Sequence, residues 1–297
     1  MIDLHAHTDR SDGSTEPGDL VRLAIDEGIQ ALGIADHDTL AGYDAALPTA
    51  AVCGLELVCA VELSTRPNEE SAPGKRERSV HLLGYWLFSP PSAEFRRWLQ
   101  SQQESRHQRN VDLAARLQQL GIAITLGDAE IYGRNQVGRP HFARVLCDKG
   151  YVSNMQEAFD LYLADEAQAA VDRDEPTLEQ GIRRISESGG IASLAHPVRL
   201  PQRGPELANL LERLIDVGLQ AIEVFHSEHS RAETAEYAEL ARRFDLIPTG
   251  GSDFHGENKP SIRLGHGIDS NIRLAYSFLE NMREMCATRQ HRTSDTV

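Results

Sequence analysis

Short apolar runs alternate with amphipathic stretches along much of this chain of 297 residues, and this alternation limits the possible folds more than any other feature. The pattern predicts helices from Thr15 to Gly28 and at 205–217 and 231–244, and strands at 1–5, 31–35, 55–61, 80–86, 190–195, 221–225 and 246–250. Repeated strand–helix units indicate a parallel sheet, either open or closed into a barrel. Polar residues follow most of the strands, and this is where a barrel carries its chemistry, so we favour a barrel.

The alternation stops in the middle of the chain. Residues 92–120 are typical of one long helix ending at Gly121, and helical fragments continue to about residue 184. We therefore predict an α/β protein with a discontinuous barrel domain, residues 1–90 and 186–297. A small helical domain, residues 91–185, is expected as an inserted lid that contributes to substrate binding. The segment from residue 271 should be a helix with a frayed end.

The charge balance limits the class of ligand. The chain has 30 lysines and arginines against 45 aspartates and glutamates, which gives a net charge of −15. Proteins that grip long DNA or RNA usually present a basic face, so a long nucleic acid is not expected as a partner. A small phosphorylated ligand held by a few arginines is compatible with this charge. No protein partner is implied.

The sequence also argues against a membrane protein or a secreted one. It has no apolar stretch of the roughly 20 residues that a membrane-spanning helix needs. Histidines stand near the N-terminus where a signal peptide has an apolar core, so we expect a cytoplasmic location. None of the four cysteines belongs to a C-x-x-C pair, which disfavours a zinc ribbon or a thioredoxin-like motif.

Asp3, His5 and His7 alternate at the start of the chain, so their side chains point to the same face of the first predicted strand. Imidazoles and a carboxylate on a partly buried face are costly unless a partner satisfies them, and a divalent cation does so. For this motif alone, a polar surface strand explains the residues about as well. The later strand ends favour a metal, because they carry further histidines and carboxylates: Asp36, His37, Asp38, Glu62, His81, His196, Asp253 and His255.

The types of ligand narrow the choice of metal and leave the reaction open. Imidazoles and carboxylates without a thiolate suit Mn²⁺, Zn²⁺, Fe²⁺ or Mg²⁺. About nine candidate ligands exceed the four or so that one Zn²⁺ takes, so we expect two or three ions that share a carboxylate, with Glu62 as the bridge. Such ions suit phosphoryl transfer, but also amide hydrolysis and deamination.

A series of motifs, in order along the chain, resembles the PHP family, the polymerase and histidinol phosphatase domains. The motifs are D-L-H-A-H-T-D-R-S-D-G (3–13), A-D-H-D-T (35–39), V-E-L-S (61–64), S-V-H-L-L-G-Y (79–85), A-H-P (195–197) and G-S-D-F-H (251–255). The resemblance implies a distorted (β/α)₇ barrel with two or three metal ions, often Mn²⁺, and the activity of a metal-dependent phosphoesterase.

Matched motif by motif, the resemblance also implies a set of ligands. The three metals would be held by His5, His7, Glu62 and Asp253, by Glu62, His81 and His196, and by Asp12, His37 and His255. Many family members have a histidine at the position of Asp12. Asp3 is not a usual ligand, and we expect it to orient one of the histidines.

The predicted insert carries a dense set of hydrogen-bond donors, namely Arg134, Asn135, Arg139 and His141. Arginine forks match phosphate oxygens in pairs, so we favour a phosphate clamp over a helix-capping loop with solvated arginines. The stretch G-R-N-Q-V-G-R-P-H-F-A-R (133–144) resembles the branch of the PHP family that includes 3′,5′-nucleoside bisphosphate phosphatase.

Outside the insert, the strand ends offer further substrate contacts: Arg199, His226 and His229. Lys259 and Arg263 are expected at the surface. Together the features predict a phosphatase that removes the 3′-phosphate from nucleoside 3′,5′-bisphosphates. The catalytic residues would be His37, His255 and Asp253. The alternatives are a 5′→3′ exoribonuclease on short 5′-phosphorylated RNA, a histidinol-phosphate phosphatase, a C–N hydrolase, and a non-catalytic nucleotide sensor with a structural metal.

Overall fold

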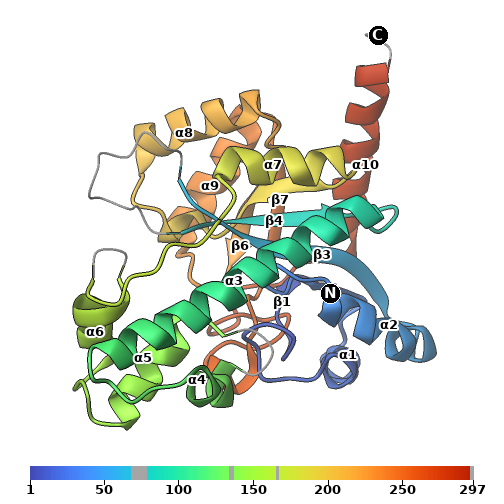
Figure 1. Cartoon of the computed structure of the whole chain (residues 1–297). Helices are drawn as coiled ribbons and strands as arrows, with labels where there is room; N and C mark the ends of the chain where they lie inside the picture. Colours follow the sequence, from blue (N-terminus) through green and yellow to red (C-terminus); the bar gives the residue numbers. More distant parts are fainter. Residues whose placement is uncertain (68–78, 134–136, 165–166, 295–297) are drawn as a thin grey trace.

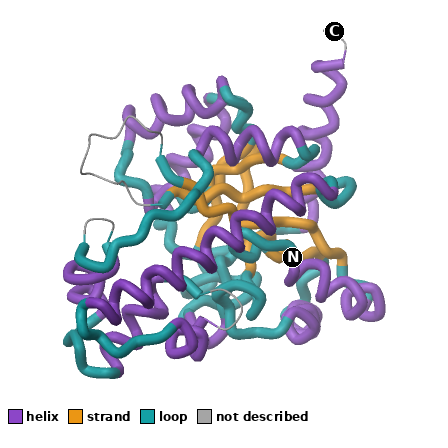
Figure 2. The backbone as a smooth tube through the Cα atoms, in the orientation of Figure 1, coloured by secondary structure: helices purple, strands orange, loops and turns teal. Residues whose placement is uncertain are grey.

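The strands form one sheet that is nearly closed into a barrel, with helices around it (Figures 1 and 2). The structure is a computed structural model that describes residues 1–67, 79–133, 137–164 and 167–294, with side chains up to residue 288. The strands neighbour one another in chain order: β1 (Ile2–Ala6), β2 (Ala31–Ile34), β3 (Glu56–Thr65), β4 (Val80–Trp86), β5 (Ile191–Leu194), β6 (Ala221–His226) and β7 (Ile247–Gly251). Next to β7, the Asp253 amide donates to the His5 carbonyl at 2.7 Å, which draws β1 and β7 together.

Strand β4 runs antiparallel to both of its neighbours, whereas the other pairs in the sheet are parallel. The prediction of a parallel sheet is therefore wrong at this strand. Strand β3 also continues past the predicted residue 61, because Thr65 pairs with Val80 of β4. An antiparallel β4 begins at the edge where the parallel strands end, which brings His81 opposite Ser64.

The helices that cover the sheet are α1 (Pro17–Asp26), α2 (Ala41–Cys53), α7 (Leu178–Glu187), α8 (Gly204–Asp216), α9 (Arg231–Arg243) and α10 (Tyr276–Ser294). The predicted cap of the first helix is wrong by one residue, since Glu16 and not Thr15 is its N-cap. Gly28 follows this helix with φ of 71°, a left-handed conformation that favours glycine. Helix α9 starts with a capping box, in which Ser230 and Glu233 bond to each other's amides.

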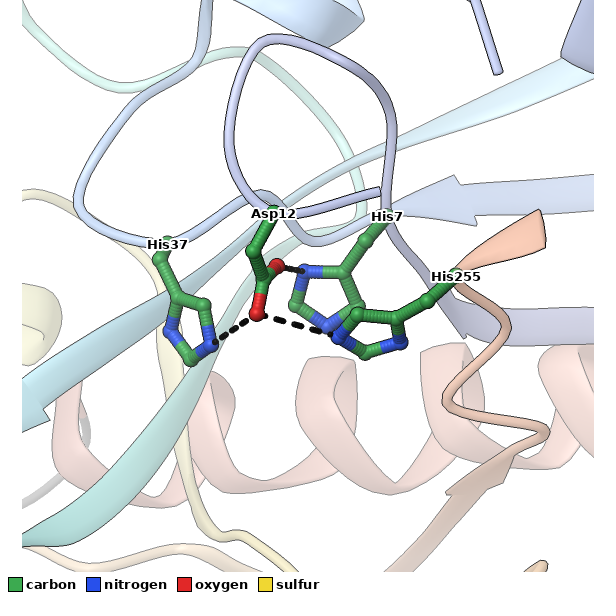
Figure 3. A group of neighbouring side chains, drawn as sticks. All are labelled: His7, Asp12, His37 and His255. Carbon is green, nitrogen blue, oxygen red and sulfur yellow. Dashed lines mark ion pairs between the residues drawn. The ribbon is translucent and has the colours of Figure 1, made fainter. Parts of the chain in front are cut away.

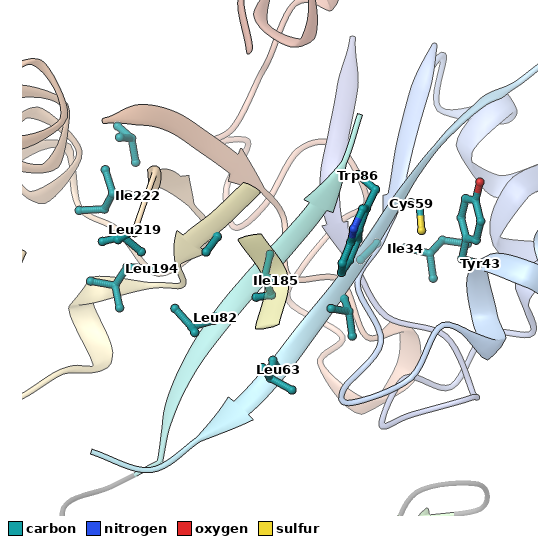
Figure 4. Packing of buried hydrophobic residues seen from close by; sticks show 14 of the residues in the cluster. Ile34, Tyr43, Cys59, Leu63, Leu82, Trp86, Ile185, Leu194, Leu219 and Ile222 are labelled. Carbon is teal, nitrogen blue, oxygen red and sulfur yellow. The ribbon is translucent and has the colours of Figure 1, made fainter. Parts of the chain in front are cut away.

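Apolar side chains from the sheet and the covering helices form the main core (Figure 4). Along β3, Val61 and Leu63 join this core, which also contains Leu82 of β4 and Ile185 of α7. A residue in a strand points away from its neighbours, so Glu62 faces the other side of the sheet. None of the described helices is both long and apolar enough to cross a membrane.

The described chain between β4 and α7 is mostly helical, and part of it packs in a separate apolar cluster. The elements are α3 (Ala93–Gln119), α4 (Leu126–Gly133), α5 (Arg139–Asp148), α6 (Met155–Ala158) and a π-helical turn (Phe159–Leu163). The predicted long helix is confirmed, with Ser92 as its N-cap and Gly121 in a left-handed conformation just after its end. Buried apolar residues between 113 and 169 pack together in this separate cluster. Figure 1 shows α4, α5 and α6 gathered at one end of α3. The boundaries 91–185 of a helical domain stay a prediction.

Candidate metal centre

Glu62 lies at the middle of the candidate site, with its side chain buried among imidazoles. Its Oε2 lies 3.1 Å from His7 Nε2 and 3.4 Å from His5 Nε2. His37, just after β2, brings its Nε2 to 3.4 Å from the same oxygen. Burial would raise the pKa of the Glu62 carboxyl, but the nearby histidines outweigh burial and hold this pKa well below its usual value. The carboxyl is therefore ionised, as a metal ligand must be.

The second oxygen of Glu62 faces a different pair of histidines. Oε1 lies 2.7 Å from His81 Nδ1 and 2.7 Å from His196 Nε2. His81 reaches this edge of the barrel because β4 runs antiparallel to the other strands. Each oxygen of Glu62 thus has its own group of imidazoles, which is the arrangement expected of a carboxylate that bridges two metal ions.

Asp12 lies among a further group of histidines (Figure 3). Its Oδ1 lies 3.4 Å from His7 Nδ1, and its Oδ2 lies 3.2 Å from His255 Nε2 and 3.6 Å from His37 Nε2. The loop after β1 supplies Asp12, so three strand ends meet at this carboxylate. The ligand atoms of these four residues lie within 4.8 Å of one another, and those of His5, His7, Glu62 and Asp253 do the same.

Asp253 joins the histidine cluster to positive charges. Its Oδ1 lies 3.3 Å from His7 Nε2, on the side of the candidate ligands. Its Oδ2 accepts hydrogen bonds from Arg199 at 2.8 Å and from Lys259 at 2.9 Å. Lys259, predicted at the surface, is 32% exposed but also reaches the site, because the short 3₁₀ helix Gly256–Asn258 turns the chain back toward it. Arg263, by contrast, is 60% exposed, as predicted.

A carboxylate that the sequence analysis missed holds two of the candidate ligands. Glu223, within β6, is fully buried and its Oε1 lies 2.8 Å from His5 Nδ1. Its Oε2 accepts a hydrogen bond from the His196 amide at 2.6 Å. The bond to Nδ1 leaves His5 Nε2 to face Glu62, so Glu223 sets the orientation of this ring. A signal was present, since a single glutamate interrupts the apolar run A-I-E-V-F.

Asp3 has a different role from the expected one. Its Oδ1 accepts hydrogen bonds from the amides of His5 at 3.2 Å and Ser252 at 2.9 Å, and its Oδ2 accepts one from Gly265 at 2.7 Å. Asp3 therefore ties β1 to the segments after β7 through their backbones, and it does not orient a histidine ring.

The backbone carries strain at two candidate ligands. His196 has φ of 26° and Asp253 has φ of 57°, in the region that side-chain-bearing residues rarely adopt. Such conformations persist only where the surroundings hold them, and they cluster at functional sites. Two hydrogen bonds supply that support: the His196 amide donates to Glu223, and the Asp253 amide donates to the His5 carbonyl.

Divalent metal ions fit these residues. His7 Nε2 and Asp253 Oδ1 are buried, and neither has a hydrogen-bond partner among the described residues. Buried polar atoms without partners are costly, and a cation between them would satisfy both. The donor set contains only imidazole nitrogens and carboxylate oxygens, which suits borderline and hard divalent ions.

The centre opens into a cavity of about 720 Å³ that reaches the helical segment. Asp12, His37 and Glu62 line it together with cationic side chains: Arg106, Arg109, Arg139, Arg144, Arg199 and Lys259. The local positive charge is notable in a chain of net charge −15, because it suits an anionic ligand.

The structure brings together part of the predicted substrate site. Arg139, His141 and Arg199 line the cavity, whereas Arg134 and Asn135 lie outside the described residues. His141 Nδ1 also accepts a hydrogen bond from the Gly138 amide at 2.9 Å, so this ring caps α5 as well.

His226 and His229 are buried beneath the centre and do not line the cavity. His226 Nε2 lies 3.4 Å from Asp253 Oδ2, and the His229 ring lies 2.9 Å from the Val224 carbonyl through Nδ1. The neighbours of the two rings are thus protein groups, Val224 of β6 and Asp253 after β7, which argues against the predicted direct contacts with a substrate.

Comparisons with known proteins agree with this geometry. The family model described as PHP domain matches residues 3–172. The 5′-3′ exoribonuclease Rnm of Escherichia coli is 36% identical, with 90% of this chain and 89% of the relative covered. The 3′,5′-nucleoside bisphosphate phosphatase of Chromobacterium violaceum is 31% identical, with 90% and 92% covered. A solved amidohydrolase structure from C. violaceum, with bound sulfate and no metal, has a TM-score of 0.74 and 30% identity, with 95% and 96% covered.

The fold, the cluster of ligands and these relatives define a metal-dependent phosphoesterase. The chain belongs to the PHP family, as its motifs predicted.

Proposed function

We propose that this protein removes the 3′-phosphate from nucleoside 3′,5′-bisphosphates, such as adenosine 3′,5′-bisphosphate, and yields AMP and phosphate. The observation that carries the proposal is that candidate metal ligands and several arginines line one cavity. A substrate with two phosphates matches such a cavity, because one phosphate needs the metals and the other needs only positive charge. The name of the C. violaceum relative supports this choice of substrate.

In the proposed reaction, the oxygen of a water molecule bonds to the 3′-phosphorus, the bond from phosphorus to the ribose oxygen breaks, and that oxygen takes up a proton. Two or three divalent ions, with Mn²⁺ favoured, would activate the water and offset the charge of the phosphate. His5, His7, Glu62, His81, His196 and Asp253 would hold two of them, and Asp12, His37 and His255 would hold the third.

Arg199 and Lys259 would bind the oxygens of the reacting phosphate. Both side chains are about one-third exposed and reach the rim of the centre through Asp253. Burial lowers the pKa of His37 to about 4, so its neutral ring suits a ligand better than a proton donor. Where the Asp12 group holds no ion, we therefore assign the proton of the leaving ribose oxygen to His255, whose Nδ1 donates to the Asp253 carbonyl.

The second candidate is a 5′→3′ exoribonuclease on short 5′-phosphorylated RNA. The observation that favours it is the 36% identity to the E. coli exoribonuclease. The two reactions are chemically close, since both break the bond between phosphorus and the 3′-oxygen of a 5′-phosphorylated nucleoside. The negative net charge favours the smaller substrate.

The test is phosphate release from adenosine 3′,5′-bisphosphate by protein that has been stripped with a chelator and then supplied with Mn²⁺. We expect release only after metal is added. A parallel series of 5′-phosphorylated oligoribonucleotides of increasing length separates the candidates. Shortening of the RNA without release from the bisphosphate would favour the exoribonuclease, and inactivity on both substrates would contradict a catalytic role.

A further inference from the structure

Three arginines apart from the candidate ligands line the wall of the cavity, namely Arg106 and Arg109 of α3 and Arg139 of α5, and the charge of a fourth, the buried Arg173, also acts on Arg109. Strand β3 places Arg106 relative to the centre. Arg106 donates to Ser64, which stands two residues after Glu62 in this strand. Two residues of strand span roughly 7 Å. The arginines therefore lie close to the candidate metals without sharing their ligands.

Arg106 has partners within the protein. It bonds to the carboxylate of Asp38 and donates to Ser64 Oγ at 2.9 Å. Asp38 Oδ1 in turn accepts a hydrogen bond from the Ser64 amide at 2.7 Å. This network fixes α3 to the ends of β2 and β3, so Arg106 is a structural contact as well as a wall of the cavity.

Arg109 lacks an equivalent partner. Its side chain is mostly buried, and its Nε donates to the Asn110 side chain at 3.0 Å. No carboxylate in the described part of the chain forms an ion pair with it. Burial and the charges of Arg106 and Arg139 lower the pKa of Arg109 to about 9. A guanidinium held among like charges is costly, and its presence at a cavity wall calls for an anion that comes from outside.

Arg173 adds to the excess of positive charge behind Arg109. Its side chain is 3% exposed, and its Nη2 lies 3.3 Å from Glu175 Oε1 and 3.5 Å from Asp38 Oδ2. Its Nε and Nη1 have no hydrogen-bond partner among the described residues. Asp38 also pairs with Arg106, so the carboxylates described here do not balance the arginines.

From this arrangement we propose that Arg109, flanked by Arg106 and backed by Arg173, binds the second phosphate of the substrate while the first occupies the metal centre. The inference rests on the proposed function and deepens it, because it makes Arg109 the residue that selects substrates with a 5′-phosphate. The same subsite would accept the 5′ end of a short RNA, since the recognised group is identical.

The test compares Arg109→Gln and Arg109→Lys with Arg97→Gln, a control at an exposed arginine of the same helix. Each is assayed with Mn²⁺ on adenosine 3′,5′-bisphosphate and on adenosine 3′-monophosphate, which lacks the second phosphate. We expect R109Q to raise KM for the bisphosphate by about tenfold to a hundredfold, to leave the monophosphate unchanged, and R109K to restore part of the loss. Equal effects of R109Q and R97Q on the bisphosphate would overturn the inference.

Thermal unfolding in buffer without phosphate or sulfate distinguishes binding from a structural role. Loss of one of several like charges should leave R109Q as stable as the wild type or more stable. A large drop in Tm would assign Arg109 to the scaffold and overturn the inference.

Binding of AMP to metal-free protein keeps the inference testable if the bisphosphate is not a substrate. AMP carries only the 5′-phosphate, so its calorimetric affinity reports on this subsite alone. Weaker binding to R109Q than to R97Q supports the subsite even if the proposed reaction fails. Equal binding, or none to the wild type, overturns it.

Discussion

Glu223 Oε1 lies 2.8 Å from Nδ1 of His5, and both side chains are fully buried beneath the candidate metal centre. Burial raises the pKa of Glu223, but the positive character of His5 and His226 outweighs it and lowers the value to about 2, so the carboxylate is ionised at neutral pH. An ionised partner fixes the ring and makes its other nitrogen a better ligand.

We therefore expect Glu223→Gln to weaken metal binding by about tenfold to a hundredfold. The glutamine keeps the shape of the side chain and removes its charge. Calorimetric titration of metal-stripped protein with Mn²⁺ measures the affinity. Glu239→Gln, at an exposed glutamate of α9, is the matched control. Unchanged affinity in E223Q would show that His5 is not a ligand or does not depend on this carboxylate.

Lys259→Met tests the cation at the rim. Lys259 Nζ lies 2.9 Å from Asp253 Oδ2, and the variant removes a charge that can also reach a substrate phosphate. We expect kcat/KM for the bisphosphate to fall by about tenfold to a hundredfold, while the metal content measured by mass spectrometry stays constant. Arg263→Met, at an exposed residue paired with Glu27, should have no effect. Loss of bound metal in K259M would contradict a role in substrate binding and would show that Lys259 supports the metal ligands.

Arg106→Gln tests the contact between α3 and the barrel. Asp38 is fully buried and loses its main cation in this variant, so we expect a loss of about 3 kcal/mol in the free energy of unfolding. Denaturant unfolding at pH 7 measures it.

The same contact predicts a pH dependence. Burial would raise the pKa of Asp38, but Arg106 and Arg173 outweigh it and lower the pKa far below its usual value. A carboxyl with a lowered folded-state pKa stabilises the fold above its unfolded pKa of about 3.9, and this stabilisation is lost as the pH falls. The difference between wild type and R106Q should therefore shrink below about pH 4. A constant difference across this range would exclude the Asp38 pair as its cause.

The cysteines test the packing of the core. Burial raises the pKa of the Cys59 thiol to about 12, whereas Cys53 is exposed at the end of α2. At pH 8 a thiol reagent should label Cys53 in the native protein and Cys59 only after unfolding, because the thiolate is the reactive form. Peptide mass mapping reads the sites, with Cys53→Ser as the control. Rapid native labelling of Cys59 would contradict the packing of β3 against α2.

The sequence predicted the strands and the residues at their ends well, for a physical reason. Apolar runs mark buried strands, and residues such as His5 and Glu62 contrast with these runs. The edge where the strands end then brings such residues together without any knowledge of helix packing. The ligand roles themselves stay proposals.

Features that depend on contacts between distant segments could not be predicted in this way. The direction of β4 follows from its pairing with β3 and β5, and no local pattern records it. Lys259 approaches Asp253 because of a short turn, and Arg109 resembles the other arginines of α3 until the cavity is known. Glu223 was also missed, although the sequence alone could have indicated it, since a lone carboxylate in an apolar strand points to a buried partner.

The most direct test of the proposed function is the identity of the nucleotide that remains after hydrolysis. Adenosine 3′,5′-bisphosphate is incubated with the Mn²⁺-loaded protein, and the products are resolved by chromatography against AMP and adenosine 3′-monophosphate. We predict AMP and phosphate in equal amounts, since in the proposed orientation the 3′-phosphate would face the metals and the 5′-phosphate the arginines. Formation of adenosine 3′-monophosphate, or no hydrolysis at all, would contradict the proposed orientation and function.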